Sequence, residues 1–275
     1  MLKVPFYKMS GSGNDFIIID NREGTYDKLK TPEFVTAVCR RSISIGADGL
    51  IFIENSKSCD FIWRFYNSDG SAPEMCGNGA RCAARFAVLN GIAGKSMSFE
   101  TVAGIITAQV KGEVVKIRLS QPGEMKTNVN LDVDGEILSL SFINTGVPHA
   151  IILLDDIETV QIKELGSKIR FHKYFQPVGT NVNFISIASD NVVNIRTYER
   201  GVEDETFACG TGSVAAALVA VAMGRVSSPV KVKTRSNEIL TVHVKENSPP
   251  FKEVYLEGGT RVVYEGEIWD EAYTS

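Results

Sequence analysis

The 275-residue chain has no long hydrophobic run and no cluster of basic residues. Its densest apolar run, Val214 to Met223, is too short to cross a bilayer. The N-terminus reaches Lys8 and Asn14 before the apolar core of a signal peptide can form. The formal net charge is −4 and is not offset by any basic run, so nothing supports nucleic-acid binding. We therefore expect a cytoplasmic protein that binds neither nucleic acid nor membrane.

Histidine is scarce, and the cysteines follow no pattern of a metal site or a disulfide framework. The three histidines lie at no ligand spacing from one another or from a cysteine, which argues against zinc. Five cysteines include no C-x-x-C pair, and without a secretion signal we expect them to be reduced. The sequence thus predicts no metal site. The positions are His149, His172 and His243, and Cys39, Cys59, Cys76, Cys82 and Cys209.

Two short stretches share an unusual pattern of a cysteine, then Gly-polar-Gly, then a helical run. They are Met75-Cys76-Gly77-Asn78-Gly79 and Ala208-Cys209-Gly210-Thr211-Gly212. The first turn of a helix has unpaired N–H groups and the positive end of the helix dipole, and glycine lets an anion approach them. A cysteine at such a position has a lowered pKa. The pattern predicts two activated thiols, each beside a binding site for an anion.

The spacing of these stretches indicates an internal repeat. Cys76 follows the loop glycine Gly13 by 63 residues, and Cys209 follows Gly146 by 63. We expect an α+β fold of two pseudo-symmetric halves, each a mixed β-sheet curled like a barrel around a central helix. The run after Cys209 is apolar nearly all round, which suits a buried helix. Gln121-Pro122-Gly123 is the predicted linker, which gives domains 1–121 and 122–261; the last strand, within 262–275, can return to either half.

If a pseudo-twofold axis relates the halves, the two Cys-Gly loops face each other across the cleft between the domains. A substrate carboxylate can then lie between two helix starts, with a sulfur on either side of the adjacent carbon. One thiolate removes the α-proton, and the other thiol delivers a proton to the opposite face. Donors aimed at the carboxylate stabilise the enolate-like charge as it forms. This arrangement inverts a stereocentre and needs no cofactor.

Five motifs occur in order along the chain: Ser-Gly-Asn-Asp-Phe at 12–16, Tyr-Asn-Ser-Asp-Gly at 66–70, Cys-Gly-Asn-Gly-Ala-Arg-Cys at 76–82, Tyr-Glu-Arg-Gly at 198–201 and Ala-Cys-Gly-Thr-Gly at 208–212. Together they resemble the diaminopimelate epimerase family. The resemblance implies a two-domain fold of barrel-like halves with central helices. It also implies a homodimeric, pyridoxal-independent enzyme that interconverts LL- and meso-2,6-diaminopimelate for lysine and peptidoglycan synthesis.

The resemblance also implies roles for individual residues. Cys76 is the proton acceptor and Cys209 the proton donor, with the roles exchanged in the reverse direction. His149 and Glu199 flank the thiols and either tune them or contact the ammonium group. The residues implied in substrate binding are Asn14, Asn67, Gly77, Asn78, Asn181, Glu199, Arg200, Gly210 and Thr211, of which Arg200 pairs with the distal carboxylate.

This sequence departs from the family pattern at two positions. Val147 stands where an asparagine contacts the distal end of the substrate, and Gly49 stands where a glutamine follows Asp48. Both departures remove hydrogen-bonding groups from the predicted site.

Two other functions remain open from the residues alone. One is a cofactor-independent racemase of the same fold that acts on proline or hydroxyproline, and the other is a protein that binds a small anion without chemistry. Buried structural thiols explain Cys39, Cys59 and Cys82 best. The same explanation for Cys76 and Cys209 together is disfavoured by their matched Gly-x-Gly contexts.

Overall fold

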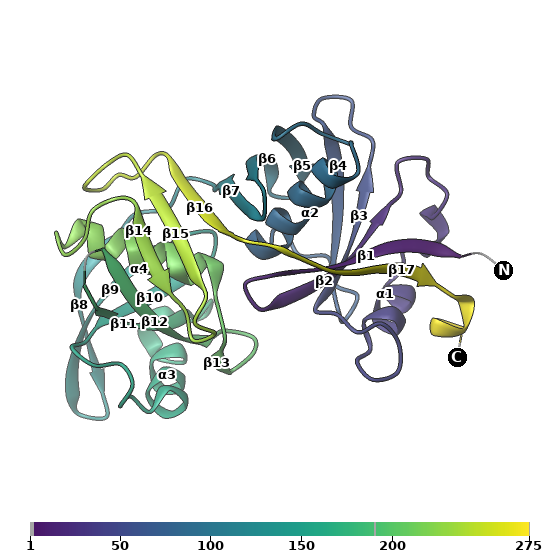
Figure 1. Cartoon of the computed structure of the whole chain (residues 1–275). Helices are drawn as coiled ribbons and strands as arrows, with labels where there is room; N and C mark the ends of the chain where they lie inside the picture. The colour runs from purple at the N-terminus through teal and green to yellow at the C-terminus, as the bar shows by residue number, and fades with distance from the viewer. Residues whose placement is uncertain (1–2, 190, 275) are drawn as a thin grey trace. The chain divides into compact units, whose positions relative to one another are not determined.

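The computed structural model describes residues 3–189 and 191–274, and the chain divides into two compact units (Figure 1). One unit comprises Met1–Ile117 with Gly258–Ser275, and the other comprises Arg118–Glu257. The domain limits expected from the sequence, at 121/122 and 261/262, stay a prediction.

The N-terminal unit contains one mixed sheet, in which the C-terminal strand lies beside the first strand. The pairings give the order β17-β1-β2-β3-β4-β5-β6-β7, with β2/β3 and β4/β5 parallel and the other pairs antiparallel. The last strand thus belongs to this unit, and β1 is an inner strand. The strands are β1 (Val4–Gly11), β2 (Asn14–Asp20), β3 (Gly49–Glu54), β4 (Phe61–Asn67), β5 (Ser96–Thr101), β6 (Gly104–Lys111), β7 (Val114–Arg118) and β17 (Arg261–Ile268).

Helix α2 (Gly77–Leu89) is the centre of this unit. It packs against β1, β2 and β3 and also against β6, near the other end of the strand order. The sheet therefore curls around the helix. The outer face of β2 and β3 is covered by α1 (Pro32–Cys39), which begins at the N-cap Thr31 with proline in its first turn.

The C-terminal unit repeats this arrangement around α4 (Gly210–Ala222). The pairings give the order β8-β9-β10-β11-β12-β14-β15-β16, with β10/β11 and β12/β14 parallel and the other pairs antiparallel; β13 also pairs with β12. Helix α3 (Ile162–Arg170) packs on the outer face of β11 and β12. The strands are β8 (Lys126–Val133), β9 (Glu136–Asn144), β10 (Pro148–Leu153), β11 (Asn181–Ile187), β12 (Val192–Glu199), β13 (Asp204–Thr206), β14 (Val230–Lys233), β15 (Ile239–Val244) and β16 (Val254–Gly259).

The two strand orders match position by position, including both parallel pairs. In the order of the sheet, β17 takes the place in the first unit that β8 takes in the second. The predicted fold class, α+β with two pseudo-symmetric halves around central helices, is therefore confirmed. The ten residues from Gly212 to Val221 are all buried, as the apolar sequence of α4 predicts.

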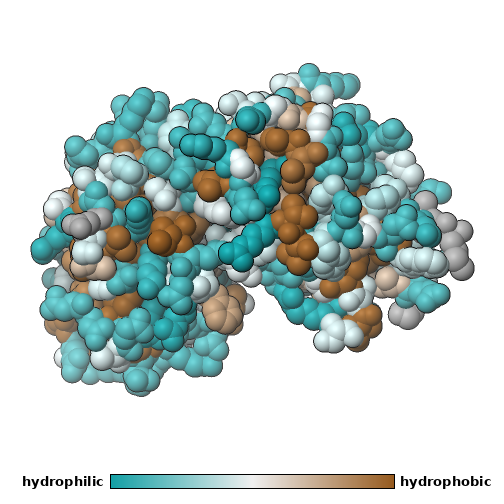
Figure 2. Space-filling view, in the orientation of Figure 1, coloured by the Kyte–Doolittle hydropathy of each residue, from teal (hydrophilic) through white to brown (hydrophobic). Residues whose placement is uncertain are grey.

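Hydrophilic side chains cover most of the visible surface of both units (Figure 2). On the N-terminal unit, hydrophobic side chains gather over the start of β17 and over α2 (Figure 2). Apolar residues exposed on these elements are Leu89, Val262 and Val263. Within the described residues, no helix combines the length and the apolar character needed to span a membrane.

Candidate active site

Cys76 is the N-cap of the central helix in the N-terminal unit. Its backbone is extended, and its sulfur accepts a hydrogen bond from the N–H of Gly79 at 3.5 Å. The sulfur thus sits directly at the helix start, where the partial positive charge of the dipole is strongest. No side chain fits easily at Gly79, because a Cβ there would lie 3.2 Å from the Trp63 ring. The glycine therefore lets the helix start lie close against the sheet.

A directed chain of hydrogen bonds connects this helix start to the loop before β2. Arg81 is fully buried and donates to the side-chain oxygens of Asn78 and Ser12, at 2.9 and 2.7 Å. Asn78 donates to Asn14 at 2.7 Å, and Asn14 donates to Asp48 at 3.0 Å. The two predicted substrate residues Asn14 and Asn78 are therefore brought together, and one amide hydrogen of Asn14 is not used by this chain of bonds.

A cluster of charges anchors the end of that chain. Asp15 forms ion pairs with Lys8 at 2.8 Å and with Arg41 at 2.6 Å, and Arg41 also pairs with Asp48 at 2.8 Å. Burial alone would raise the pKa of Asp15, but the hydrogen bonds from Arg41 and Lys8 outweigh it and lower this pKa to about 2. Asp15 is therefore ionised at neutral pH and fixes the loop that carries Asn14.

Cys209 occupies the equivalent N-cap in the C-terminal unit. Its sulfur accepts from the N–H of Gly212 at 3.4 Å and lies 3.5 Å from the hydroxyl of Thr211. The hydroxyl of Thr145, in the loop before β10, donates to the carbonyl of Thr211 at 3.0 Å. Each unit thus ties its glycine-rich loop to the start of its central helix.

His149 is fully buried on β10, two residues after Val147. Its Nδ1 lies 3.1 Å from the side-chain nitrogen of Asn183 on β11, and its Nε2 has no hydrogen-bond partner among the described residues. Burial, and to a lesser extent the charge of Arg200, lowers the pKa of His149 to about 3. The imidazole is therefore neutral throughout the physiological range.

Glu199 and Arg200 end β12 and begin the following turn. Burial raises the pKa of Glu199, and the nearby hydroxyl of Thr206 opposes this only in part. Arg200 is half-buried, and its Nη1 donates to the carbonyl of Val178 at 2.9 Å. Asn181 accepts from the backbone N–H of Arg200 at 2.9 Å, so the structure brings these predicted residues together.

The side chain of Asn181 has two structural contacts. Besides accepting from Arg200, it donates to the carbonyl of Pro148 at 3.1 Å. It therefore joins the strand of His149 to the turn of Arg200. The predicted substrate contact of Asn181 stays a prediction.

The two departures from the family pattern have different surroundings. Gly49 begins β3 opposite Asn67, whose side chain donates to Ser71 at 3.0 Å. A Cβ at Gly49 would lie 2.6 Å from the carbonyl oxygen of Tyr66, so this backbone cannot accept a glutamine without moving. The structure gives no comparable explanation for Val147, which is half-buried in its loop.

The remaining cysteines lie away from the two helix starts. Cys82 is fully buried in the body of α2, and Cys59 is half-buried. Burial raises the pKa of Cys39 to about 12, so its thiolate is absent at neutral pH. In the part of the chain that the structure describes, no group of three or more histidine, cysteine or acidic side chains is arranged to hold a metal ion.

Several residues at these two helix starts were not predicted from the sequence. Arg81 and Ser12 lie inside quoted motifs and Asp48 does not, but the contacts of Arg81 with Ser12 and of Asp48 with Asn14 join distant parts of the chain. Asn183 was missed altogether. A polar residue inside the apolar strand Asn181–Ile187 is the signal that could have identified it.

A model of the family described as diaminopimelate epimerase matches the chain twice, over residues 6–127 and 141–263. The chain belongs to the diaminopimelate epimerase family. The first match lies mainly in the N-terminal unit and the second mainly in the C-terminal unit, in agreement with the repeated strand order.

Relatives in this family are similar over almost their whole length. A diaminopimelate epimerase of Aquifex aeolicus is 47% identical over 277 residues, which cover 97% of this chain and 98% of that protein. A diaminopimelate epimerase of Archaeoglobus fulgidus is 40% identical, with 96% of each chain covered.

Solved structures show that the fold is shared more widely than the family. A phenazine biosynthesis protein of the PhzF family from Bacillus anthracis has a TM-score of 0.75 at 16% identity, covering 98% of this chain and 100% of that chain. A hydroxyproline epimerase from Agrobacterium vitis has a TM-score of 0.70 at 13% identity, covering 97% and 91%. At such identities the likeness concerns the fold alone.

Proposed function

We propose that this member of the diaminopimelate epimerase family interconverts LL- and meso-2,6-diaminopimelate with Cys76 and Cys209 as the two bases. The observation that carries the proposal is the matched placement of both cysteines as helix N-caps, each with its sulfur on a backbone N–H of the first turn. Near-full-length similarity to relatives named diaminopimelate epimerase supports this substrate over proline.

In the proposed reaction, the thiolate of Cys76 takes the α-proton of the LL substrate, and the electron pair of that C–H bond passes into the adjacent carboxylate. The thiol of Cys209 then gives its proton to the opposite face of the carbon. The enzyme is left with a neutral Cys76 thiol and a Cys209 thiolate, the form that acts on meso substrate in reverse. N–H groups at the two helix starts, from Gly77-Asn78 and Gly210-Thr211, hold the reacting carboxylate and stabilise its added charge.

The surrounding residues have supporting roles in this proposal. Asn14, Asn67 and Asn181 hydrogen-bond the substrate, and the Arg200 guanidinium pairs with the distal carboxylate. Glu199 and His149 flank the thiols. Burial raises the pKa of Glu199, which makes this carboxyl a better proton acceptor than an exposed one. No cofactor enters any of these steps.

Solvent deuterium tests the reaction. Incubation of LL-diaminopimelate in heavy water should yield meso product with deuterium at the inverted carbon. Cys76→Ala and Cys209→Ala should each lose epimerisation by about a thousandfold or more, while Cys59→Ala, a half-buried cysteine outside the site, keeps it. Deuterium entering L-proline but not diaminopimelate would instead favour the proline-type racemase, and ligand binding without any exchange would favour the anion-binding protein.

We also propose that the protein is a homodimer that pairs through β17. This strand pairs with β1 along one edge, and the described residues supply no strand ladder for its other edge. Its residues Val262, Val263 and Tyr264 are 37%, 56% and 44% exposed. An exposed apolar edge strand favours pairing with a strand of another chain. An antiparallel pair of β17 strands centred on Val263 would set Arg261 of each copy opposite Glu265 of the other.

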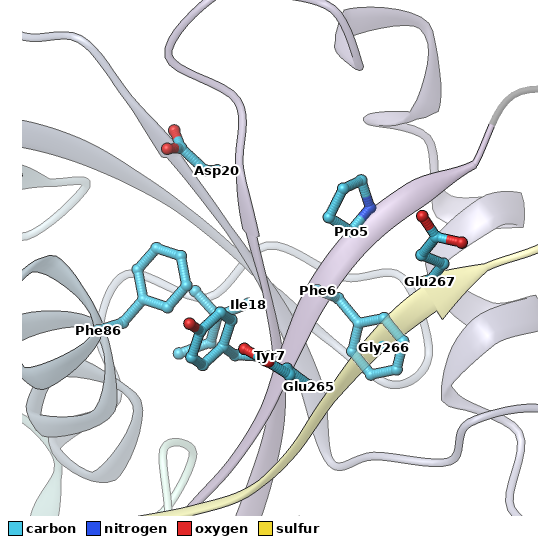
Figure 3. Close-up of a pocket in the computed structure, with 9 residues that line it drawn as sticks. All are labelled: Pro5, Phe6, Tyr7, Ile18, Asp20, Phe86, Glu265, Gly266 and Glu267. Atoms are coloured by element: carbon cyan, nitrogen blue, oxygen red, sulfur yellow. The ribbon is translucent and has the colours of Figure 1, made fainter. Parts of the chain in front are cut away.

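A surface cavity adjoins the proposed interface strand β17. A cavity of about 300 Å³ lies between β1, β17 and α2, and its walls include Tyr7, Phe86 and Glu265 (Figure 3). Tyr7 and Glu265 lie side by side there, and burial together with a hydrogen bond to Glu265 raises the pKa of Tyr7 (Figure 3). Light scattering tests the proposal: Val263→Asp should give a monomer, whereas Ile137→Asp, at an exposed apolar residue of the other unit, should not. A wild-type protein that is monomeric at micromolar concentration would refute it.

The proposed chemistry needs both thiols in the reduced state. This requirement favours a reducing compartment, in agreement with the cytoplasmic location expected from the sequence.

A further inference from the structure

The imidazole of His149 has no exposed surface. One ring nitrogen, Nδ1, faces the side-chain amide of Asn183, and the other, Nε2, has no hydrogen-bond partner among the described residues. Since a neutral imidazole carries one proton, the amide contact decides which nitrogen is the donor.

The orientation of the Asn183 amide follows from its two other contacts. Its nitrogen Nδ2 lies 3.2 Å from the backbone carbonyl of Ala150, and its oxygen Oδ1 accepts from the hydroxyl of Thr197 at 3.0 Å. A carbonyl oxygen can only accept, so the amide group facing Ala150 must be the NH₂. The same NH₂ faces Nδ1 of His149, and therefore Nδ1 accepts and Nε2 carries the proton.

The N-terminal unit has no counterpart of this polar group at the matching positions. Phe16 pairs with Gly49 as His149 pairs with Asn181, so Phe16 takes the place of His149 in the repeat. Two residues further along these strands, Ile51 lies opposite Phe65 in the first unit, where Asn183 lies opposite Thr197 in the second.

These two sets of side chains lie against the same part of each helix start. A Cβ on Gly79 would meet the Ile51 and Phe16 side chains at 3.4 Å, whereas a Cβ on Gly212 would meet Asn183 Oδ1 at 2.5 Å. The side chains beneath the start of α2, Phe16 and Ile51, thus form an apolar floor. Those beneath the start of α4, His149 and Asn183, form a hydrogen-bonded polar floor. Since burying an amide is unfavourable unless it is fully bonded, the polar floor requires a reason beyond packing.

We propose that Asn183 is a positioning residue that holds His149 as the neutral Nε2–H tautomer, so that the ring is a hydrogen-bond donor and not a proton-accepting base. The hydroxyl of Thr197 fixes the orientation of the Asn183 amide by donating a hydrogen bond to its oxygen. The imidazole then offers one buried N–H that can bind an electron-rich atom, such as a thiolate sulfur or a carboxylate oxygen. Only the kinetic part of the test rests on the proposed epimerase function.

Nitrogen NMR of the full-length protein labelled with ¹⁵N-histidine tests the tautomer directly and does not depend on activity. The chain has only three histidines, and His149→Gln assigns the signals of interest. We expect a non-protonated Nδ1 and a protonated Nε2 for His149, unchanged between pH 8 and pH 6. A protonated Nδ1, or a cationic ring in this range, would overturn the proposal.

Two substitutions test the role of the amide. Asn183→Asp is nearly isosteric but offers only acceptors, so we expect the proton of His149 to move to Nδ1 and kcat for diaminopimelate to fall by about 10-fold to 100-fold, with KM changed less than about threefold. Asn183→Leu, which imitates Ile51 of the other unit, should leave Nδ1 without its donor and give a mixture of tautomers.

The matched control is Asn194→Asp. Asn194 lies on β12, where its side chain contacts Ser186 and not His149. The Asn194→Asp variant should have the wild-type histidine spectrum, and its kcat should lie within about twofold of the wild-type kcat. If Asn183→Asp and Asn183→Leu both retain the wild-type tautomer, Asn183 does not set it. If they change the tautomer without changing kcat, the ring is not a donor in the reaction, and the proposal is equally refuted.

Discussion

The buried imidazole of His149 makes the stability of the C-terminal unit sensitive to acid. The ordinary pKa of histidine is 6.5, and burial lowers that of His149 to about 3. The unfolded chain therefore binds a proton more readily than the folded one, so acid favours unfolding. This contribution to stability is fully present above pH 6.5 and is lost as the pH falls from 6.5 toward 3.

The size of the effect follows from the two pKa values. At pH 5 the unfolded histidine is almost fully protonated and the folded one is almost fully neutral, so the loss is about 2 kcal/mol relative to pH 8. By pH 3, where the folded histidine is half protonated, the loss is about 4 kcal/mol. The fully buried side chain justifies using the whole shift, because solvent does not screen it.

Urea unfolding of the wild type and of His149→Gln at pH 8, 6.5 and 5 measures this contribution. Glutamine does not titrate, and every other ionisable group is common to both proteins. The difference in unfolding free energy between wild type and variant should therefore shrink by about 2 kcal/mol between pH 8 and pH 5. A difference that stays constant over this range would show that His149 is not held neutral by burial, and the reasoning would fail.

Three further substitutions test the packing and the charges of the N-terminal unit by urea unfolding at pH 7. Gly49→Gln should destabilise by about 3 kcal/mol, because its Cβ would lie 2.6 Å from the carbonyl oxygen of Tyr66; unchanged stability would mean that the strand adapts freely. Asp15→Asn should lower stability by about 3 kcal/mol, since it leaves the nearly buried Lys8 without its carboxylate; a loss below about 1 kcal/mol would contradict this. Thr31→Ala should lower stability by about 1 kcal/mol through the lost N-cap bond, and an equally stable variant would show that the cap contributes nothing.

Features that depend on local sequence were predictable. Both central helices begin at the predicted Cys-Gly stretches, because an N-cap, glycines and an apolar run lie next to one another in the chain. The repeat in the fold was also predictable, since equal spacing of two loops from two cysteines needs no knowledge of pairing. Cys39, which the sequence predicts as a buried structural thiol, is buried in α1.

Features that depend on pairing between distant strands were not predictable. The sequence does not predict the hairpin of β8 and β9, because most of its residues are exposed and the alternation of apolar and polar side chains is weak. β1 lies between β2 and β17, and β17 comes from the other end of the chain. No window of sequence contains both strands.

The site shows the same division between local and distant information. The cysteines and their glycines form one continuous motif, so their placement at helix starts follows from capping alone. Asn183 is recognised only when β10, β11 and β12 lie side by side, since its partners His149 and Thr197 come from the two neighbouring strands. A buried asparagine whose three contacts are all distant in sequence reads as an ordinary strand residue until the sheet is known.

The repeat gives both thiols the same helix start, but a two-base epimerase needs them to differ in protonation at any moment. Two equal thiols with equal surroundings would have no preference for which is the thiolate. The apolar Phe16, Ile51 and Phe65 lie at the positions that His149, Asn183 and Thr197 occupy in the other half, so the surroundings are unequal. A neutral N–H donor stabilises an anion without adding a charge that would have to be neutralised when the proton returns. In the proposed reaction, this difference in surroundings would bias which thiol is the thiolate within an otherwise symmetric scaffold, and exchanging Asn183 for the isoleucine of the other half should weaken that bias.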